Sequence, residues 1–136
     1  MTGRGHDTLY KERTHTVKRD MDLIRKILFE VEKAPYSGPN RIDLEIEGYS
    51  WEDISHHVLL LWEAEFIEGA EASGRGREYK PIRLTWDGHE FLEAVKDDTR
   101  WAKVKNAMGK AGGFVYQIAM SVATTLLKEQ ALSLLE

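Results

Sequence analysis

Hydrophobic residues recur at intervals of three and four positions from Lys18 onward. This spacing places them on one face of a helix, and Asp20 and Asp22 suit the positively polarised N-terminal end of that helix. The helix must end before Pro35, because the segment APYSGPN is rich in residues that break helices. The apolar stripe consists of Met21, Ile24, Ile27, Leu28 and Val31.

The pattern changes to strict alternation of apolar and acidic residues over residues 42–47, IDLEIE. A period of two is typical of a strand with one buried face, so we expect Ile42, Leu44 and Ile46 to point inward. Gly48 ends this predicted strand.

A second helix is predicted from Trp51, because Ser50 is a good N-cap and Asp53 stands where a capping box places its acid. The face expected to be buried consists of Trp51, Ile54, Val58 and Leu61, with a hydrogen-bonded His57 on its flank. The face expected to point outward contains Glu52, His56, Leu59 and Glu63.

Two segments that favour strands flank the glycine-rich stretch SGRGR, residues 73–77. They predict a β-hairpin with a mobile tip. Thr85 then caps a helix whose buried stripe is Phe91, Leu92 and Val95.

The last part of the chain is also helical in pattern. Thr99 is expected to cap a segment that carries Trp101, Val104 and Met108, and a final helix is expected from Phe114 to about Leu135. That helix is apolar around most of its circumference. Its two opposite apolar sides are Phe114, Ile118 and Leu132, and Tyr116, Ala123, Leu127 and Leu134. One monomer cannot easily bury both sides, so we expect a homodimer.

The element order of helix, strand, helix, hairpin, helix and helix indicates an α+β, mostly helical fold. It is the order of a winged-helix (winged helix-turn-helix-like) domain with a C-terminal helical extension. We expect residues 1–16 to form a flexible arm, residues 17–98 the winged-helix domain, and residues 99–136 the extension and dimerisation element.

Length, net charge and cysteine content narrow the classes of function that the protein can have. The chain has 136 residues, 42% of them hydrophobic and 31% charged, as expected of one globular domain. A net charge of −4 restricts nucleic-acid contact to a local patch. The absence of cysteine excludes disulfides, thiolate zinc sites and cysteine nucleophiles. We find no pattern of an export signal at the N-terminus. The uncharged segment Ala111–Leu127 is too short to span a membrane. We therefore expect the protein in the cytoplasm of a bacterial host.

Three blocks read together carry a family resemblance: VKRDMDLIRKILFEVE, EIEGYSWEDISHHVLLLWEAEFIEG and RLTWDGHEFLEAVKDDTRWAKVK. In this combination the chain resembles a phage and prophage family, the domain of unknown function numbered 2513, over about residues 17–130. The resemblance implies a winged-helix fold and a viral or prophage setting, and it implies no activity. Members usually start with Met at the position of Val17, so residues 1–16 would be an extension.

The helix that begins at Trp51 holds the position of a DNA-reading helix, yet its charge is wrong for that role. Seven acidic residues and no Lys or Arg lie between Glu45 and Glu68. Of its outward residues, only Ser55 and His56 suit contact with bases. This pattern favours a scaffold or protein-facing helix, with partner-binding candidates Glu52, His56, Leu59, Trp62 and Glu63.

Local excesses of positive charge occur in the hairpin and in the N-terminal arm. They could hold duplex DNA nonspecifically through phosphate contacts, or be a solvated loop and tail. The nucleic-acid-binding candidates are Arg75, Arg77, Lys80, Arg83, Lys18 and Arg19.

No pattern nominates a catalytic residue, a metal or a cofactor. The adjacent His56 and His57 diverge by about 100° on a helix, and His89 and Glu90 lack the second histidine of a zinc-protease motif, since residue 93 is Glu. We therefore predict a non-enzymatic phage or prophage accessory protein with DNA-binding or transcription-modulating activity. The alternative is a module that binds a host or viral protein, such as a defence or transcription complex.

Overall fold

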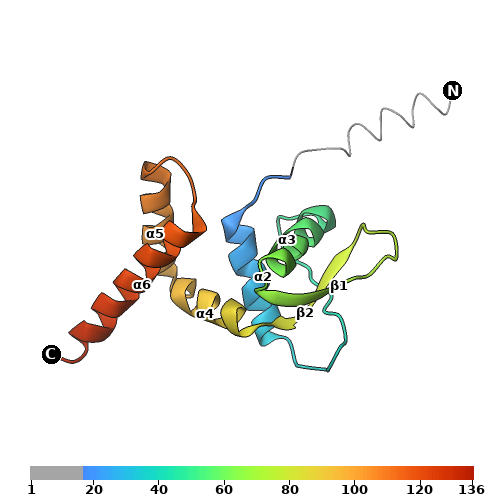
Figure 1. Ribbon diagram of the computed structural model, residues 1–136, viewed down its shortest axis with the longest axis horizontal. Helices are drawn as coiled ribbons and strands as arrows, with labels where there is room; N and C mark the ends of the chain where they lie inside the picture. Colours follow the sequence, from blue (N-terminus) through green and yellow to red (C-terminus); the bar gives the residue numbers. More distant parts are fainter. Residues whose placement is uncertain (1–16) are drawn as a thin grey trace.

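The computed structural model describes residues 17–136, which form five helices and a two-stranded antiparallel sheet (Figure 1). This confirms an α+β, mostly helical fold. The expected N-terminal arm, residues 1–16, lies outside the described residues. The predicted domain boundary at residue 98 stays a prediction. The elements are α2 (Met21–Lys33), α3 (Trp51–Glu63), β1 (Ile67–Glu71), β2 (Tyr79–Leu84), α4 (Trp86–Val95), α5 (Asp98–Lys110) and α6 (Tyr116–Ser133).

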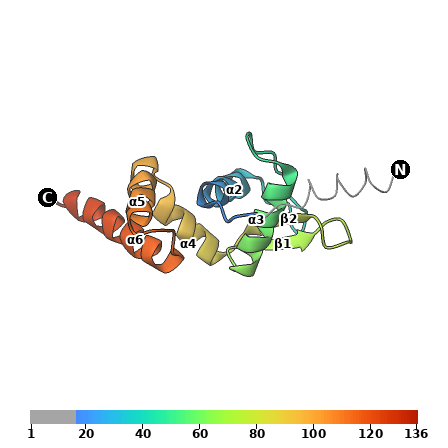
Figure 2. The same cartoon turned by 90° about the horizontal axis from the view of Figure 1, so that it is seen from above.

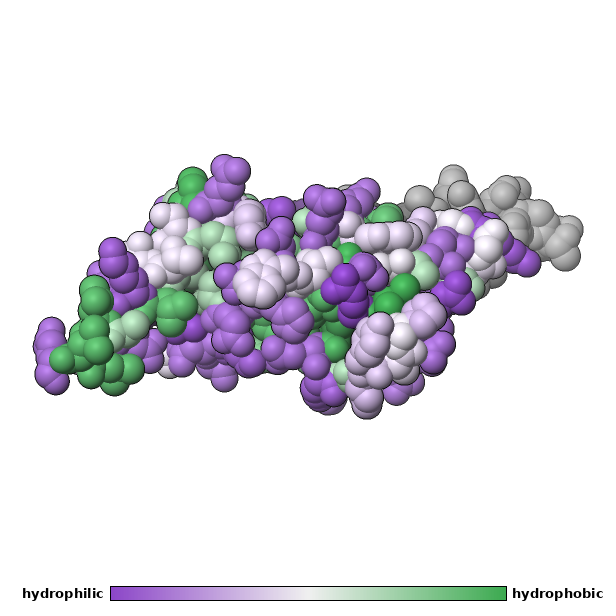
Figure 3. Space-filling view, turned by 60° about the horizontal axis from the view of Figure 1, so that its bottom comes forward, coloured by the Kyte–Doolittle hydropathy of each residue, from purple (hydrophilic) through white to green (hydrophobic). Residues whose placement is uncertain are grey.

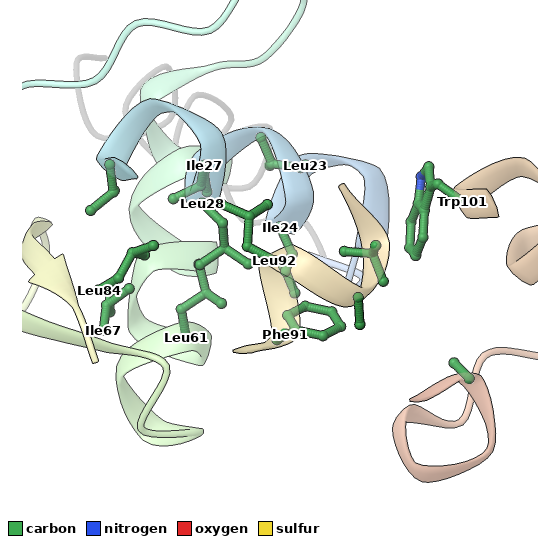
Figure 4. Close-up of a cluster of buried hydrophobic side chains, with 14 of the residues drawn as sticks. Leu23, Ile24, Ile27, Leu28, Leu61, Ile67, Leu84, Phe91, Leu92 and Trp101 are labelled. Carbon is green, nitrogen blue, oxygen red and sulfur yellow. The ribbon is translucent and has the colours of Figure 1, made fainter. Parts of the chain in front are cut away.

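The described chain is elongated. Helices α2 and α3 and the hairpin form one end, α5 and α6 form the other, and α4 joins them (Figures 1 and 2). The core lies where α2, α3, the hairpin and α4 meet, and its side chains converge from all four (Figure 4). Its fully buried members include Leu23, Ile27, Leu28, Val58, Leu61, Ile67, Phe91 and Leu92. The predicted stripe of α4 is therefore confirmed, and that of α2 is confirmed at Ile24, Ile27, Leu28 and Val31. Met21 is only half-buried, and Leu23, which the predicted stripe omitted, is fully buried.

Polar side chains cap four helices at their first turn. Ser50 accepts a hydrogen bond from the backbone N–H of Asp53 at 3.1 Å, and Thr85 accepts one from Gly88 at 3.1 Å, as predicted. The predicted cap at Thr99 is wrong. Asp97 has the extended backbone of a cap and accepts from the N–H of Arg100, so Thr99 falls inside the first turn of α5.

The predicted strand at residues 42–47 is also wrong, although its alternation is real. Ile42, Leu44 and Ile46 are half-buried while the acidic residues between them are exposed. One backbone hydrogen bond, from Ile42 N–H to the carbonyl of Pro81 at 2.8 Å, joins this segment to β2. Because proline has no N–H, Pro81 cannot return the reciprocal bond of a ladder.

The junction between the hairpin and α4 depends on one glycine. Glu65 has a left-handed backbone (φ 64°) that turns the chain after α3, and its carbonyl accepts from the Thr85 hydroxyl at 2.6 Å. The next carbonyl, of Phe66, accepts from the Thr85 N–H at 3.0 Å and faces Gly88. A Cβ at Gly88 would lie 2.0 Å from that oxygen.

Two arginines hold the corner between α4 and α5. Arg25 of α2 donates to the carbonyls of Val95 and Lys96 at 2.8 and 2.7 Å. The buried Arg100 of α5 donates to the carbonyl of Ala94 at 2.7 Å and to that of Glu93 at 3.1 Å. These four carbonyls are the unpaired acceptors of the C-terminal end of α4, so two positive charges stabilise its negative pole.

Helix α6 packs on α4 and α5 by a narrow strip and leaves other apolar residues bare. Ala119 and Ala123 are its buried residues, and Tyr116 is half-buried. Ile118 is 52% exposed and Leu132 51%, and the apolar C-terminal end of the chain appears green at the left of Figure 3. Among the described residues, no helix is long and apolar enough to cross a membrane.

Candidate interaction surfaces

The outward face of α3 is acidic at both ends. Glu52 and Glu63 are exposed, and His56 and Leu59 between them are half-buried. Trp62 is 37% exposed. Its ring packs against Gly69 of β1 so closely that a Cβ added to this glycine would lie 3.1 Å from the ring. The structure thus brings the five partner-binding candidates together on one exposed stretch of α3, which we call the α3 face.

Two residues of α3 differ from their predicted orientation. Ser55, expected to point outward, is buried: its hydroxyl accepts from the N–H of Tyr79 at 2.8 Å and donates to the carbonyl of Arg77 at 3.4 Å. Trp51, expected in the core, is 56% exposed. Position 51 is the first residue of the helix, and the core begins one turn later at Ile54. The Ser55 hydroxyl is therefore bonded to the hairpin and is not available to contact a DNA base.

His57 is buried beside the core and joins α3 to the start of α2. Its Nε2 atom accepts from the backbone N–H of Asp20 at 2.8 Å, and its Nδ1 atom lies 2.7 Å from the carbonyl oxygen of Asp53. A carbonyl only accepts, so the partners assign the proton to Nδ1 and a neutral ring. The predicted hydrogen-bonded position on the flank of the core is confirmed.

The glycine-rich tip of the hairpin is held from within by the carboxylate of Glu71. Its oxygens accept from the backbone N–H groups of Ser73, Gly74, Arg77 and Glu78, and from the Ser73 hydroxyl. These bonds, led by the one from the Ser73 hydroxyl, lower the pKa of Glu71 to about 2. The carboxylate of Glu71 therefore already occupies the N–H groups that could bind a phosphate. The mobility of this loop, which the sequence predicts, stays a prediction.

Two of the predicted basic contacts are neutralised by neighbouring acids. Lys80 pairs with Asp43 at 2.5 Å, and the hydrogen bond that its ammonium group donates to this carboxylate raises the pKa of Lys80. Arg83 pairs with Glu68 at 2.6 Å across the hairpin. Neither cation is a free phosphate ligand.

The other four basic candidates lie in two different parts of the fold, two at the hairpin tip and two just before α2. Arg75 and Arg77 are exposed at the hairpin tip, and neither forms an ion pair within residues 17–136. Lys18 is exposed before α2. Arg19 donates to the carbonyl of Phe114 at 3.0 Å and lies 5.9 Å from its ring centroid, so it fastens the α5–α6 loop. Over the described part of the chain, no group of three or more His, Asp and Glu residues could hold a metal ion.

Sequence reasoning did not find the Glu71 cluster or the two arginines at the end of α4. An acid placed directly before a glycine-rich loop was the available signal for the first, because such a loop presents several free N–H groups. Arg25 bonds to carbonyls some 70 residues away in sequence, and no local pattern marks such partners. Arg100 bonds back to carbonyls six and seven residues earlier, across the corner between α4 and α5.

These features define a class: a small, mostly helical α+β domain with a helix-and-hairpin surface. Residues 18–114 match the family described as hypothetical protein (DUF2513), and the chain belongs to this family. A protein of Haemophilus influenzae described as uncharacterized is 30% identical over 115 residues, which cover 83% of this chain and 98% of that protein. No solved structure matches.

Proposed function

We propose that this protein is a non-enzymatic accessory protein of phages or prophages, built on a winged-helix plan, that binds a host or viral protein through the α3 face. One observation carries the proposal. Helix α3 directly precedes the hairpin, the place of the DNA-reading helix in winged-helix proteins, yet it holds no Lys or Arg. Its exposed charged residues, Glu52 and Glu63, are carboxylates, which DNA phosphates repel.

The composition of the α3 face supports a protein partner. Trp62 and Leu59 offer partly exposed apolar surface between Glu52 and Glu63. Aromatic residues supply much of the binding energy of protein interfaces, and surrounding charges select the partner. The expected partner therefore presents an apolar patch with basic residues around it. The cytoplasm of a bacterial host is the proposed compartment.

Site-specific photocrosslinking tests this proposal. A photoreactive p-benzoylphenylalanine replaces Glu63 on the α3 face or, as a matched control, the exposed Glu129 on α6. In nuclease-treated host lysate, we expect one protein adduct from position 63 and none of the same mass from position 129. Adding Glu52→Lys should abolish the adduct. An adduct that needs intact nucleic acid, or that forms equally from both positions, would contradict the proposal.

A second function, nonspecific contact with duplex DNA, is favoured by the tip of the hairpin. Arg75 and Arg77 project from a loop that Glu71 orders, without ion pairs to described residues. Changing both to Ala should weaken binding to every duplex equally and reduce the salt slope by about 2, since each phosphate contact contributes about 0.9. Fluorescence anisotropy over a salt series measures this. Sequence preference that survives the change would contradict nonspecific binding.

A further inference from the structure

A cavity of about 620 Å³ opens among α2, α3, α4 and α6, away from the residues that define the α3 face. Its lining is mainly apolar: Met21 of α2, Leu60 of α3 and Met120 of α6 contribute side chains from three different helices. The size lies within the range of small-molecule sites, about 300–1,000 Å³.

One wall of the cavity is aromatic. Phe66 and Phe91 stack with ring centroids 5.1 Å apart, and Tyr116 packs against both, at 5.5 and 5.4 Å. Leu61 and Ile24 also line the cavity, and with Phe91 they belong to the buried cluster drawn in Figure 4. Aromatic rings attract cations through their faces, and ring clusters are a recurring means of binding organic cations.

The charges around this wall are unbalanced. Asp87 and Glu90 of α4 line the cavity, and neither carboxylate forms an ion pair with a described residue. The one basic lining residue, Arg19, is held by the carbonyl of Phe114. Burial, and then the charge of Asp87, raise the pKa of Tyr116, so its hydroxyl stays neutral. With two carboxylates against one guanidinium, the net charge of the lining is negative.

We propose that this cavity binds a small organic cation with an apolar body, of the alkyl- or arylammonium class. The apolar body lies among Met21, Leu60 and Met120, and the ammonium group lies against the aromatic wall beside Asp87 and Glu90. This inference is independent of the partner proposed for the α3 face. It assigns a ligand class by charge and shape, because the net negative lining disfavours an anion, whereas an ammonium group is attracted by both carboxylates and by the aromatic rings.

Methionine methyl NMR can test the site directly. Met21 and Met120 line the cavity, and the buried Met108 of α5 does not, so its resonance reports general perturbation. Protein labelled with ¹³C at methionine methyls is titrated with hexyltrimethylammonium, hexanol or hexyl sulfate. We expect the ammonium compound to shift Met21 and Met120 at concentrations about tenfold lower than hexanol, and hexyl sulfate to bind more weakly than either.

Variants that neutralise the carboxylates separate charge from shape. Asp87→Asn combined with Glu90→Gln should reduce affinity for hexyltrimethylammonium about five- to tenfold and leave hexanol unaffected. Glu129→Gln, an exposed position outside the cavity, should change neither. An unshifted Met108 resonance verifies folding of each variant. Equal binding of ammonium, alcohol and sulfate, or shifts absent at both cavity methionines, would overturn the proposal.

Discussion

Replacement of His57 by Ala tests the packing between α2 and α3 more sharply than any change in the aliphatic core. The imidazole is 1% exposed and accepts the N–H of Asp20, the N-cap residue of α2. Truncation removes a buried ring, which costs about 2–4 kcal/mol by analogy with other large-to-small core changes. It also leaves the Asp20 N–H without its acceptor, at a further cost of about 1–3 kcal/mol.

The two contributions together predict a loss of about 3–7 kcal/mol, which is comparable with the whole stability of a small domain. Urea unfolding followed by circular dichroism measures it. His56→Ala is the matched control: this neighbouring ring is half-buried, so we expect a loss below about 1 kcal/mol. Equal losses from the two variants would show that the hydrogen bond between His57 and Asp20 does not join α3 to α2.

Three further predictions concern other parts of the fold. Gly88→Ala should destabilise the protein by at least about 2 kcal/mol in a thermal melt, because the added Cβ meets the Phe66 carbonyl. Gly109→Ala is the control: its Cβ meets open space, so this variant should be slightly more stable than wild type. Equal effects of the two variants would contradict the contact at Gly88. Because the pKa of Glu71 is lowered, the hydrogen bonds to its carboxylate are complete above pH 4.5 and are lost as the pH falls toward about 2. The Gly74 amide resonance should therefore shift between these pH values in the wild-type protein. In Glu71→Gln, which has no carboxylate to protonate, it should stay fixed. Light scattering at micromolar concentration should show a homodimer formed through the bare residues of α6, and a 15.6 kDa monomer would contradict that assembly.

Periodicity predicted the parts of the fold in which each element buries its own apolar face. Ile24, Ile27 and Leu28 recur at helical spacing and are buried, and the hairpin forms around its glycine-rich turn. At residues 42–47 the same reasoning found the buried positions but not the backbone partner. Alternation reports burial of side chains, whereas a strand also needs a neighbour with free N–H and C=O groups, and Pro81 lacks the former.

The site was less predictable, because its character depends on contacts between distant residues. The charge of α3 was evident from composition, but the burial of Ser55 depends on the hairpin, whose Tyr79 bonds to its hydroxyl. Similarly, Lys80 and Arg83 read as free basic residues until Asp43 and Glu68 are placed beside them. The cavity is assembled from four helices, and no single segment of the sequence carries its pattern.

Selection of duplexes from a random pool, with the purified full chain at about 0.15 M salt, distinguishes an α3 helix that faces a protein from one that reads DNA. Sequence-specific binding through α3 would require base contacts, for which His56 is the remaining suitable outward residue. We predict that repeated rounds enrich no common sequence. An enriched sequence whose selection is lost in His56→Ala or Glu52→Ala would contradict the account.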